Sequence, residues 1–130
     1  MESLKLEGSP KTPHVNFDPE SGLMELKGRS IPENSIEFYK PLIDWIDQYG
    51  RSPKAKSTLH MQLEYFNTSS SKSILDVFKK LEAIRASGNE VVILWHYEAD
   101  DEDMHEAGED YAGIINVPFK MILIEEVDGQ

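Results

Sequence analysis

Five consecutive polar residues, Asn67 to Ser71, form the stretch of this chain with the most evident chemistry. Four of them, Thr68 and the three serines after it, carry hydroxyl groups that can accept a phosphoryl group. All five have small side chains that can cap the unpaired backbone N–H groups at the start of a helix. From residue types alone, a well-capped helix start is the more ordinary interpretation, and a phosphorylation site is the alternative.

The periodicity of the flanking residues places this polar stretch between a strand and a helix. Apolar and polar residues alternate from Leu59 to Tyr65, which is the two-residue period of a strand. Apolar residues then recur three or four positions apart from Ile74 to Ile84, as on the buried side of an amphipathic helix. The sequence therefore predicts a helix from about Ser71 to Ser87, with Thr68 exposed at its N-terminus.

The rest of the chain is predicted to alternate strands with helices in the same way. The other predicted elements are a short strand over 4–6, a hairpin that turns at 18–22, a helix over 35–49 that bends near Pro41, a strand over 91–95, a weak helix within 98–110 and a strand over 121–124. The apolar run Val91 to Trp95 is typical of a strand covered on both faces. This alternation predicts one α/β domain over 1–130, with a mixed sheet, an N-terminal hairpin, right-handed β-α-β crossovers and helices packed on the sheet.

Three polar segments are expected to meet at one edge of this sheet. In an open α/β sheet, sites form beyond the carboxyl ends of the strands, where helix N-termini also point. We expect partner-binding residues from all three segments at this edge, namely Glu33 and Asn34, then Asn67, Ser69, Ser70, Ser71 and Lys72, then His96 and Tyr97. Lys72 is either a neighbour of a phosphate or an ordinary solvated residue. His96 is assigned to partner binding and not to catalysis.

Length, charge and cysteine content limit the classes of partner and of chemistry. The chain has 130 residues and a formal net charge of −11, which disfavours nucleic acid and anionic membranes as partners. It contains no cysteine, and this excludes disulfides, thiolate metal sites and cysteine nucleophiles. The N-terminal sequence lacks the apolar core of a signal peptide, and no apolar run reaches membrane-spanning length. We therefore expect a cytoplasmic protein without membrane insertion.

The sequence shows no pattern typical of a catalytic or metal site. It has no glycine-rich phosphate loop, no His-Glu pair at zinc-site spacing and no serine in an elbow between glycines. The acidic run Asp100 to Asp103, with His105 and Glu106 after it, lacks the glycine and the ligand spacing of a calcium-binding loop. We expect a non-enzymatic protein with no metal and no cofactor. A small metal-assisted hydrolase that uses the acidic stretch with His96 or His105 is the alternative.

Four short segments carry a resemblance to a known family. They are PENS at 32–35, IDW at 43–45, YFNTSSSK at 65–72 and WHYE at 95–98. In this order, over almost the whole chain, they resemble the SiaC family of bacterial regulatory phosphoproteins. Members of that family resemble STAS domains, the fold of anti-sigma-factor antagonists, which carry a phosphorylated hydroxyl at the same strand-to-helix turn. The chain departs from the family pattern at Pro41 and in its longer acidic stretch after Tyr97.

The resemblance implies a phosphorylation-controlled partner switch. It implies that Thr68 is phosphorylated by a dedicated serine/threonine kinase and dephosphorylated by a metal-dependent phosphatase. It also implies that the unphosphorylated form binds and activates a diguanylate cyclase, and so controls cyclic di-GMP signalling and biofilm formation. An anti-sigma-factor antagonist that uses the same switch on a different partner is the alternative.

Overall fold

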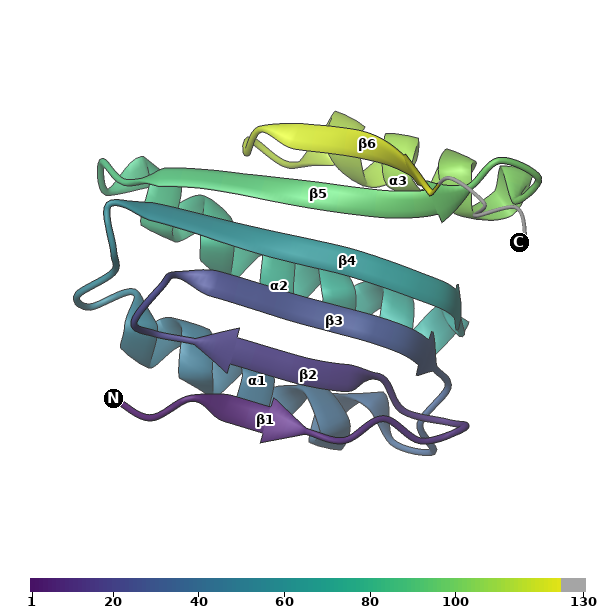
Figure 1. The fold of residues 1–130 in the computed structure, drawn as a ribbon, viewed down its shortest axis with the longest axis horizontal. Coiled ribbons are helices and arrows are strands. Elements are labelled where there is room, and N and C mark those ends of the chain that lie inside the picture. Colours follow the sequence, from purple (N-terminus) through teal and green to yellow (C-terminus); the bar gives the residue numbers. More distant parts are fainter. Residues whose placement is uncertain (125–130) are drawn as a thin grey trace, which may run out of the picture.

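The computed structural model describes residues 1–124, which form one mixed sheet and three helices. The elements are β1 (Leu4–Leu6), β2 (His14–Asp18), β3 (Leu23–Ser30), α1 (Ser35–Tyr49), β4 (Lys56–Phe66), α2 (Thr68–Ala86), β5 (Glu90–Glu98), α3 (Glu102–Ile114) and β6 (Phe119–Ile124). The strands lie in the sheet in the order of the sequence, β1 to β3 antiparallel and β3 to β6 parallel (Figure 1). This arrangement confirms the predicted α/β fold with an N-terminal hairpin.

All three helices lie on the same face of the sheet (Figure 1). From β3 onward, each new strand is added at the same edge of the sheet. Connections of the same handedness then place every helix on the same face. The expectation that the strand over 91–95 is covered on both faces is therefore wrong. Val91, Ile93 and Trp95 are buried against the helices, whereas Val92 and Leu94 are partly exposed on the helix-free face, which we call the open face.

The core between sheet and helices contains two aromatic clusters. Below α1, the ring of Trp45 stacks on Tyr49 at 5.1 Å and meets the edge of Phe17 at 5.3 Å. Below α2 and α3, the fully buried Trp95 contacts Phe78 and Tyr111, with ring centroids 6.4 and 5.5 Å away. Both clusters lie on the helix side of the sheet, and this is why apolar residues alternate along its strands.

Helix α3 packs closely on the second cluster because position 108 is a glycine. A Cβ atom on Gly108 would lie 2.6 Å from the Trp95 ring and 2.8 Å from the methyl group of Met121. The indole N–H of Trp95 donates to the carbonyl of Met104, one turn earlier in α3, at 3.0 Å. The absent side chain therefore lets the helix backbone approach the indole closely enough for this hydrogen bond.

Several element boundaries differ from those predicted, and three of the differences bear on the site. Helix α2 begins at Thr68 and not at Ser71, because Asn67 has an extended backbone and acts as the N-cap. Strand β5 continues to Glu98, since β6 pairs with it up to that residue, so His96 and Tyr97 lie inside the strand and not beyond it. The weak acidic pattern is a complete helix, α3, whose N-cap is Asp101.

Helix α1 has the predicted bounds and runs without a break through Pro41. Proline removes one backbone donor, which leaves the carbonyl of Glu37 without its usual partner. Both residues are exposed, so water can hydrate that carbonyl. A proline inside this helix is therefore tolerated on its solvent side.

Candidate phosphorylation site

The turn between β4 and α2 is fixed by hydrogen bonds that Asn67 makes. Its backbone N–H donates to the carbonyl of Ser30 at 3.0 Å, which ties the end of β4 to the end of β3. Its side-chain Oδ1 accepts the backbone N–H of Ser70 at 2.9 Å. Thr68 is consequently the first helical residue and lies at the positive end of the helix dipole.

Beneath the turn, five side-chain hydroxyls form a connected group, the hydroxyl cluster: Ser30, Ser35, Tyr39, Ser69 and Ser70. Ser30 donates to Ser70 Oγ at 2.9 Å, and Ser70 donates back to the Ser30 carbonyl at 3.0 Å. Because the proton of Ser30 is used in this way, Tyr39 must donate its own across the 2.6 Å contact to Ser30. Ser35 contacts Ser69 at 2.7 Å. The cluster therefore joins the end of β3, the start of α1 and the first turn of α2.

Burial of the cluster has an electrostatic consequence at Tyr39. This side chain is fully buried, and the loss of hydration raises the pKa of its phenol from 10.0 to about 12, although the hydrogen bond with Ser30 acts in the opposite direction. The phenol of Tyr39 is thus a neutral donor at physiological pH.

The four hydroxyls of the turn differ in what holds them. Ser70 is fully buried within the cluster, and Ser69 contacts Ser35 and donates to Asn67 Oδ1 at 3.1 Å. Ser71 donates to the carbonyl of Thr68 at 2.6 Å. Thr68 itself is exposed, and within residues 1–124 its hydroxyl has no hydrogen-bond partner. A phosphoryl donor in solution can therefore reach Thr68 without breaking a contact.

The other residues predicted near this turn lie around it. Glu33 and Asn34 are exposed directly before α1, and Asn34 caps that helix by accepting the N–H of Glu37 at 3.1 Å. The contact between Ser35 and Ser69 brings this loop against the turn. Lys72 is exposed in the first turn of α2. The buried Ser70 can affect a partner only by holding the turn.

A groove that was not expected from the sequence opens next to the turn, between α2 and α3. It has a volume of about 370 Å³ and is lined mainly by apolar side chains, from Phe66, Leu75, Ala107, Tyr111 and Ile114, with Ser71, Lys72 and Asp110 beside them. The hydroxyl of Tyr111 donates to the Ser71 carbonyl at 2.8 Å and so fixes α3 against the first turn of α2. Burial raises the pKa of Tyr111 as well.

The structure does not bring His96 to this turn. Its ring lies on the open face, with Nε2 3.2 Å from Nδ1 of His60 on β4. Tyr97 points to the other face and meets the ring of His105 in α3, with centroids 4.8 Å apart. The expected meeting of this segment with the turn is wrong, because β5 is extended through these residues and its side chains alternate between faces.

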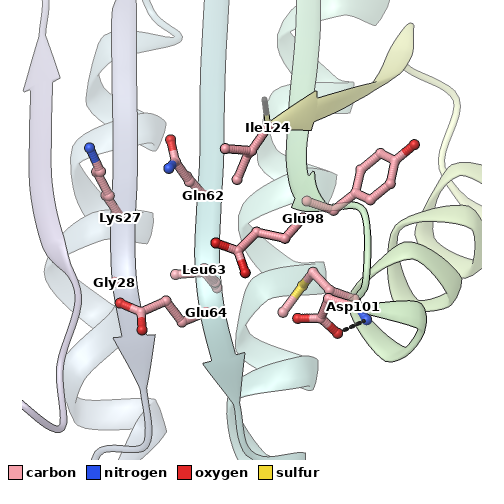
Figure 2. Close-up of a pocket in the computed structure, with 10 residues that line it drawn as sticks. Lys27, Gly28, Gln62, Leu63, Glu64, Glu98, Asp101 and Ile124 are labelled. Atoms are coloured by element: carbon pink, nitrogen blue, oxygen red, sulfur yellow. Dashed lines mark hydrogen bonds between the residues drawn. The ribbon is translucent and has the colours of Figure 1, made fainter. Parts of the chain in front are cut away.

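A second cavity, of about 270 Å³, lies where β4 and β5 separate beyond the pair Met61–Trp95 (Figure 2). The carboxylates of Glu64, Glu98 and Asp101 line it. Asp101 also accepts the N–H of Met104 at 3.0 Å, which caps α3. Within the part of the chain that the structure describes, no three histidine, aspartate or glutamate side chains are arranged to hold a metal ion. No described helix has the length and apolarity that crossing a membrane requires.

The site and the fold together define a class of protein: an α/β domain with a mixed sheet that exposes a threonine hydroxyl where a strand meets a helix. The sequence model of the SiaC family regulatory phosphoproteins matches residues 6–124, and the chain belongs to this family. The chain is also 32% identical over 119 residues to an uncharacterized protein of Pseudomonas aeruginosa (strain UCBPP-PA14). The match covers 92% of this chain and 94% of that protein.

Solved structures of SiaC from P. aeruginosa have the same fold. One of them matches with a TM-score of 0.88 and 30% identity, over 95% of this chain and 100% of the other. A chain in the crystal structure of the diguanylate cyclase SiaD with its activator SiaC matches with the same score and identity, over 93% of this chain and 99% of that one. The fold is thus shared with a protein that activates a cyclase.

Proposed function

We propose that this protein is a non-enzymatic partner switch whose unphosphorylated form binds and activates a diguanylate cyclase. The similarity to SiaC, the activator of SiaD, supports the choice of partner. The observation that carries the proposal is the state of the Thr68 hydroxyl. Thr68 and Ser69 are both exposed, but within residues 1–124 only the Thr68 hydroxyl of this run has no hydrogen-bond partner. The switch therefore has one acceptor, already positioned.

In the proposed cycle a serine/threonine kinase modifies Thr68 and a metal-dependent phosphatase restores it. The Thr68 oxygen bonds to the γ-phosphorus of ATP, ADP leaves, and the hydroxyl proton passes to a base of the kinase. The phosphatase then transfers the phosphoryl group to water and releases inorganic phosphate. Because these reactions use ATP and the cyclase uses GTP, the cycle belongs in the cytoplasm.

The phosphate acts on the partner and leaves the fold in place. It adds about −1.5 to −2 charges and three acceptor oxygens, and a helix N-terminus stabilises such a group. Lys72 in the same turn adds a positive charge. A cyclase docked over the turn and its neighbouring loop, from Glu33 and Asn34 to Lys72, must desolvate the new charge, which costs a few kcal/mol. His96 lies on the opposite face of the sheet and is not included in this docking surface.

The test first uses the unphosphorylated chain to capture binding proteins from a lysate of its own cells, and these proteins are identified by their masses. Calorimetry then measures the affinity of the captured cyclase for wild type, phosphorylated wild type and Thr68→Ala. We expect Thr68→Ala to bind like unphosphorylated wild type, and phosphorylation to weaken binding by about 30-fold or more, which corresponds to about 2 kcal/mol. Thr68→Glu is expected to have a partial effect, since it adds one charge on a flat carboxylate.

Ser71→Ala provides the matched control, because it removes a neighbouring hydroxyl and leaves Thr68 available. It should be phosphorylated and should lose cyclase binding as wild type does. Equal affinities before and after phosphorylation, with equal cyclase activity, would show that Thr68 is only part of a capped helix. Capture of an anti-sigma factor in place of a cyclase would support the other class of partner switch.

A further inference from the structure

A pair of histidines on the open face has no part in the proposed switch. His60 on β4 and His96 on β5 are 36 positions apart in the sequence, yet Nδ1 of the first lies 3.2 Å from Nε2 of the second. The rings are stacked, with centroids 5.4 Å apart and planes inclined by 26°. Both side chains are partly exposed, so an ion in solution can reach them.

Charged residues of β3 lie next to the pair on the open face. Glu25 is paired with His60 across β3 and β4, and Lys27 lies two positions further along β3. In the contact between the two imidazoles one ring nitrogen carries a proton and the other accepts it. An ion that binds both nitrogens therefore needs this proton on the opposite nitrogen of its ring, and a neutral imidazole can carry it there.

Two more charged groups complete the surroundings on the outer strands. On β2, Nε2 of His14 is 3.3 Å from Oε1 of Glu25 and holds that carboxylate on the open face. On β6, the exposed Lys120 is paired with Leu94 of β5, which is in turn paired with His60. The open face therefore carries one carboxylate, Glu25, beside the pair, whereas Lys27 and Lys120 oppose the binding of a cation.

We propose that His60 and His96 bind a divalent transition-metal ion at an exchangeable site, with Zn²⁺ as the reference ion. Two Zn–N bonds of about 2.05 Å whose nitrogens are 3.2 Å apart enclose an angle of about 103°, close to the tetrahedral value. Imidazole selects zinc, copper and nickel over magnesium and calcium. Water fills the remaining positions of this two-histidine site.

The ion would lie where the pairing of β4 with β5 ends. Met61 and Trp95 form the last pair between the two strands, and each is the chain neighbour of one histidine. Beyond this pair the strands separate around the cavity of Figure 2. An ion held by both imidazoles therefore links the strands at the point where backbone hydrogen bonds stop, and it should raise the melting temperature.

The experiment is a calorimetric titration of the full chain with ZnCl₂ in a non-chelating buffer at about pH 7.5. We expect His60→Gln and His96→Gln each to weaken zinc binding by about tenfold or more, and the same loss in wild type when the pH falls to about 5.5. His105→Gln is the matched control, since it removes a partly exposed histidine beside Glu109 in α3, and it should change the affinity less than about twofold.

Two results would overturn the site. One is wild-type protein that fails to bind zinc below about 1 mM, and the other is a His60→Gln or His96→Gln variant that binds as wild type does. Ring ¹⁵N NMR of wild type decides the matter even if both variants fold poorly. Zinc should shift Nδ1 of His60 and Nε2 of His96, whereas shifts confined to His14 or His105 would assign the ion elsewhere. None of these measurements depends on the proposed switch.

Discussion

Tyr39 links the hydroxyl cluster to the stability of the whole fold. Its folded-state pKa of about 12 lies above the ordinary value of 10.0, so the protonated phenol is favoured in the native state. The resulting stabilisation is fully present below pH 10.0 and is lost as the pH rises through about 12. We therefore expect the free energy of unfolding to fall between these values, in a way that urea unfolding at several alkaline pH values will measure.

The comparison for this prediction is Tyr39→Phe. The variant lacks the titrating group, so its free energy of unfolding should fall less steeply above pH 10.0, although it starts lower because Ser30 loses a hydrogen-bond partner. Tyr111, whose pKa burial also raises, accounts for part of the remaining fall. Parallel curves for wild type and variant would show that Tyr39 ionises in the native state as readily as in the unfolded chain.

At the scale of single residues, the sequence predicted where Thr68 lies but not what supports it. The change of period between Leu63 and Ile74 was enough to place Thr68 exposed at the start of a helix, and the structure confirms this. Ser30 and Tyr39 gave no signal, because a hydroxyl cluster assembled from three elements has no spacing along the chain. His60 was missed for the same reason, since its partner lies on another strand.

At the scale of elements, the fit between α3 and Trp95 predicts the effect of adding one methyl group. Gly108→Ala should destabilise the protein by about 1–3 kcal/mol, because the new Cβ meets a fully buried indole that has no room to move. Urea unfolding gives this difference directly. Gly113→Ala in the same helix is the control, since nothing lies within 4 Å of its added Cβ.

The control variant should be neutral, or more stable by up to about 1 kcal/mol, because alanine is the better helix former. Equal stability of Gly108→Ala and Gly113→Ala would mean that α3 can shift away from the sheet without cost. In that case the hydrogen bond from Trp95 to Met104 would also be dispensable for the position of the helix.

The two glycines also explain why α3 was only weakly evident in the sequence. They lower its helix propensity, and its exposed side is almost wholly acidic, so the periodic pattern rests on Met104, Gly108 and Tyr111. The cap from Asp101 and the contact with Trp95 outweigh that low propensity. The wrong expectation for β5 has a different origin, since an apolar strand sequence does not reveal that every helix lies on one face.

At the scale of the molecule, the two tryptophans can test whether the chain unfolds as one domain. Trp45 lies in the aromatic cluster below α1, and Trp95 lies in the cluster below α2 and α3. The parallel pair β3–β4 joins the two halves along the whole of β3. We therefore expect Trp45→Phe and Trp95→Phe, each with one tryptophan left, to show urea midpoints by fluorescence that coincide with those by far-UV circular dichroism.

Each variant provides its own comparison, because both probes are read on the same sample. A lower midpoint for fluorescence than for circular dichroism in one variant alone would reveal a half of the sheet that unfolds separately. The reporter that stays in that variant would identify the half, since Trp45 and Trp95 belong to different clusters.

The order of the strands also bears on how the chain is made. Each strand pairs with the one translated just before it, so the sheet can grow strand by strand as the polypeptide leaves the ribosome. The hydroxyl cluster needs only the segment from Ser30 to Ser70, whereas the groove beside the turn also needs α3. A nascent chain released up to the end of α2 thus already contains the groups that position Thr68. The Thr68 hydroxyl is synthesised and supported before the groove next to it exists.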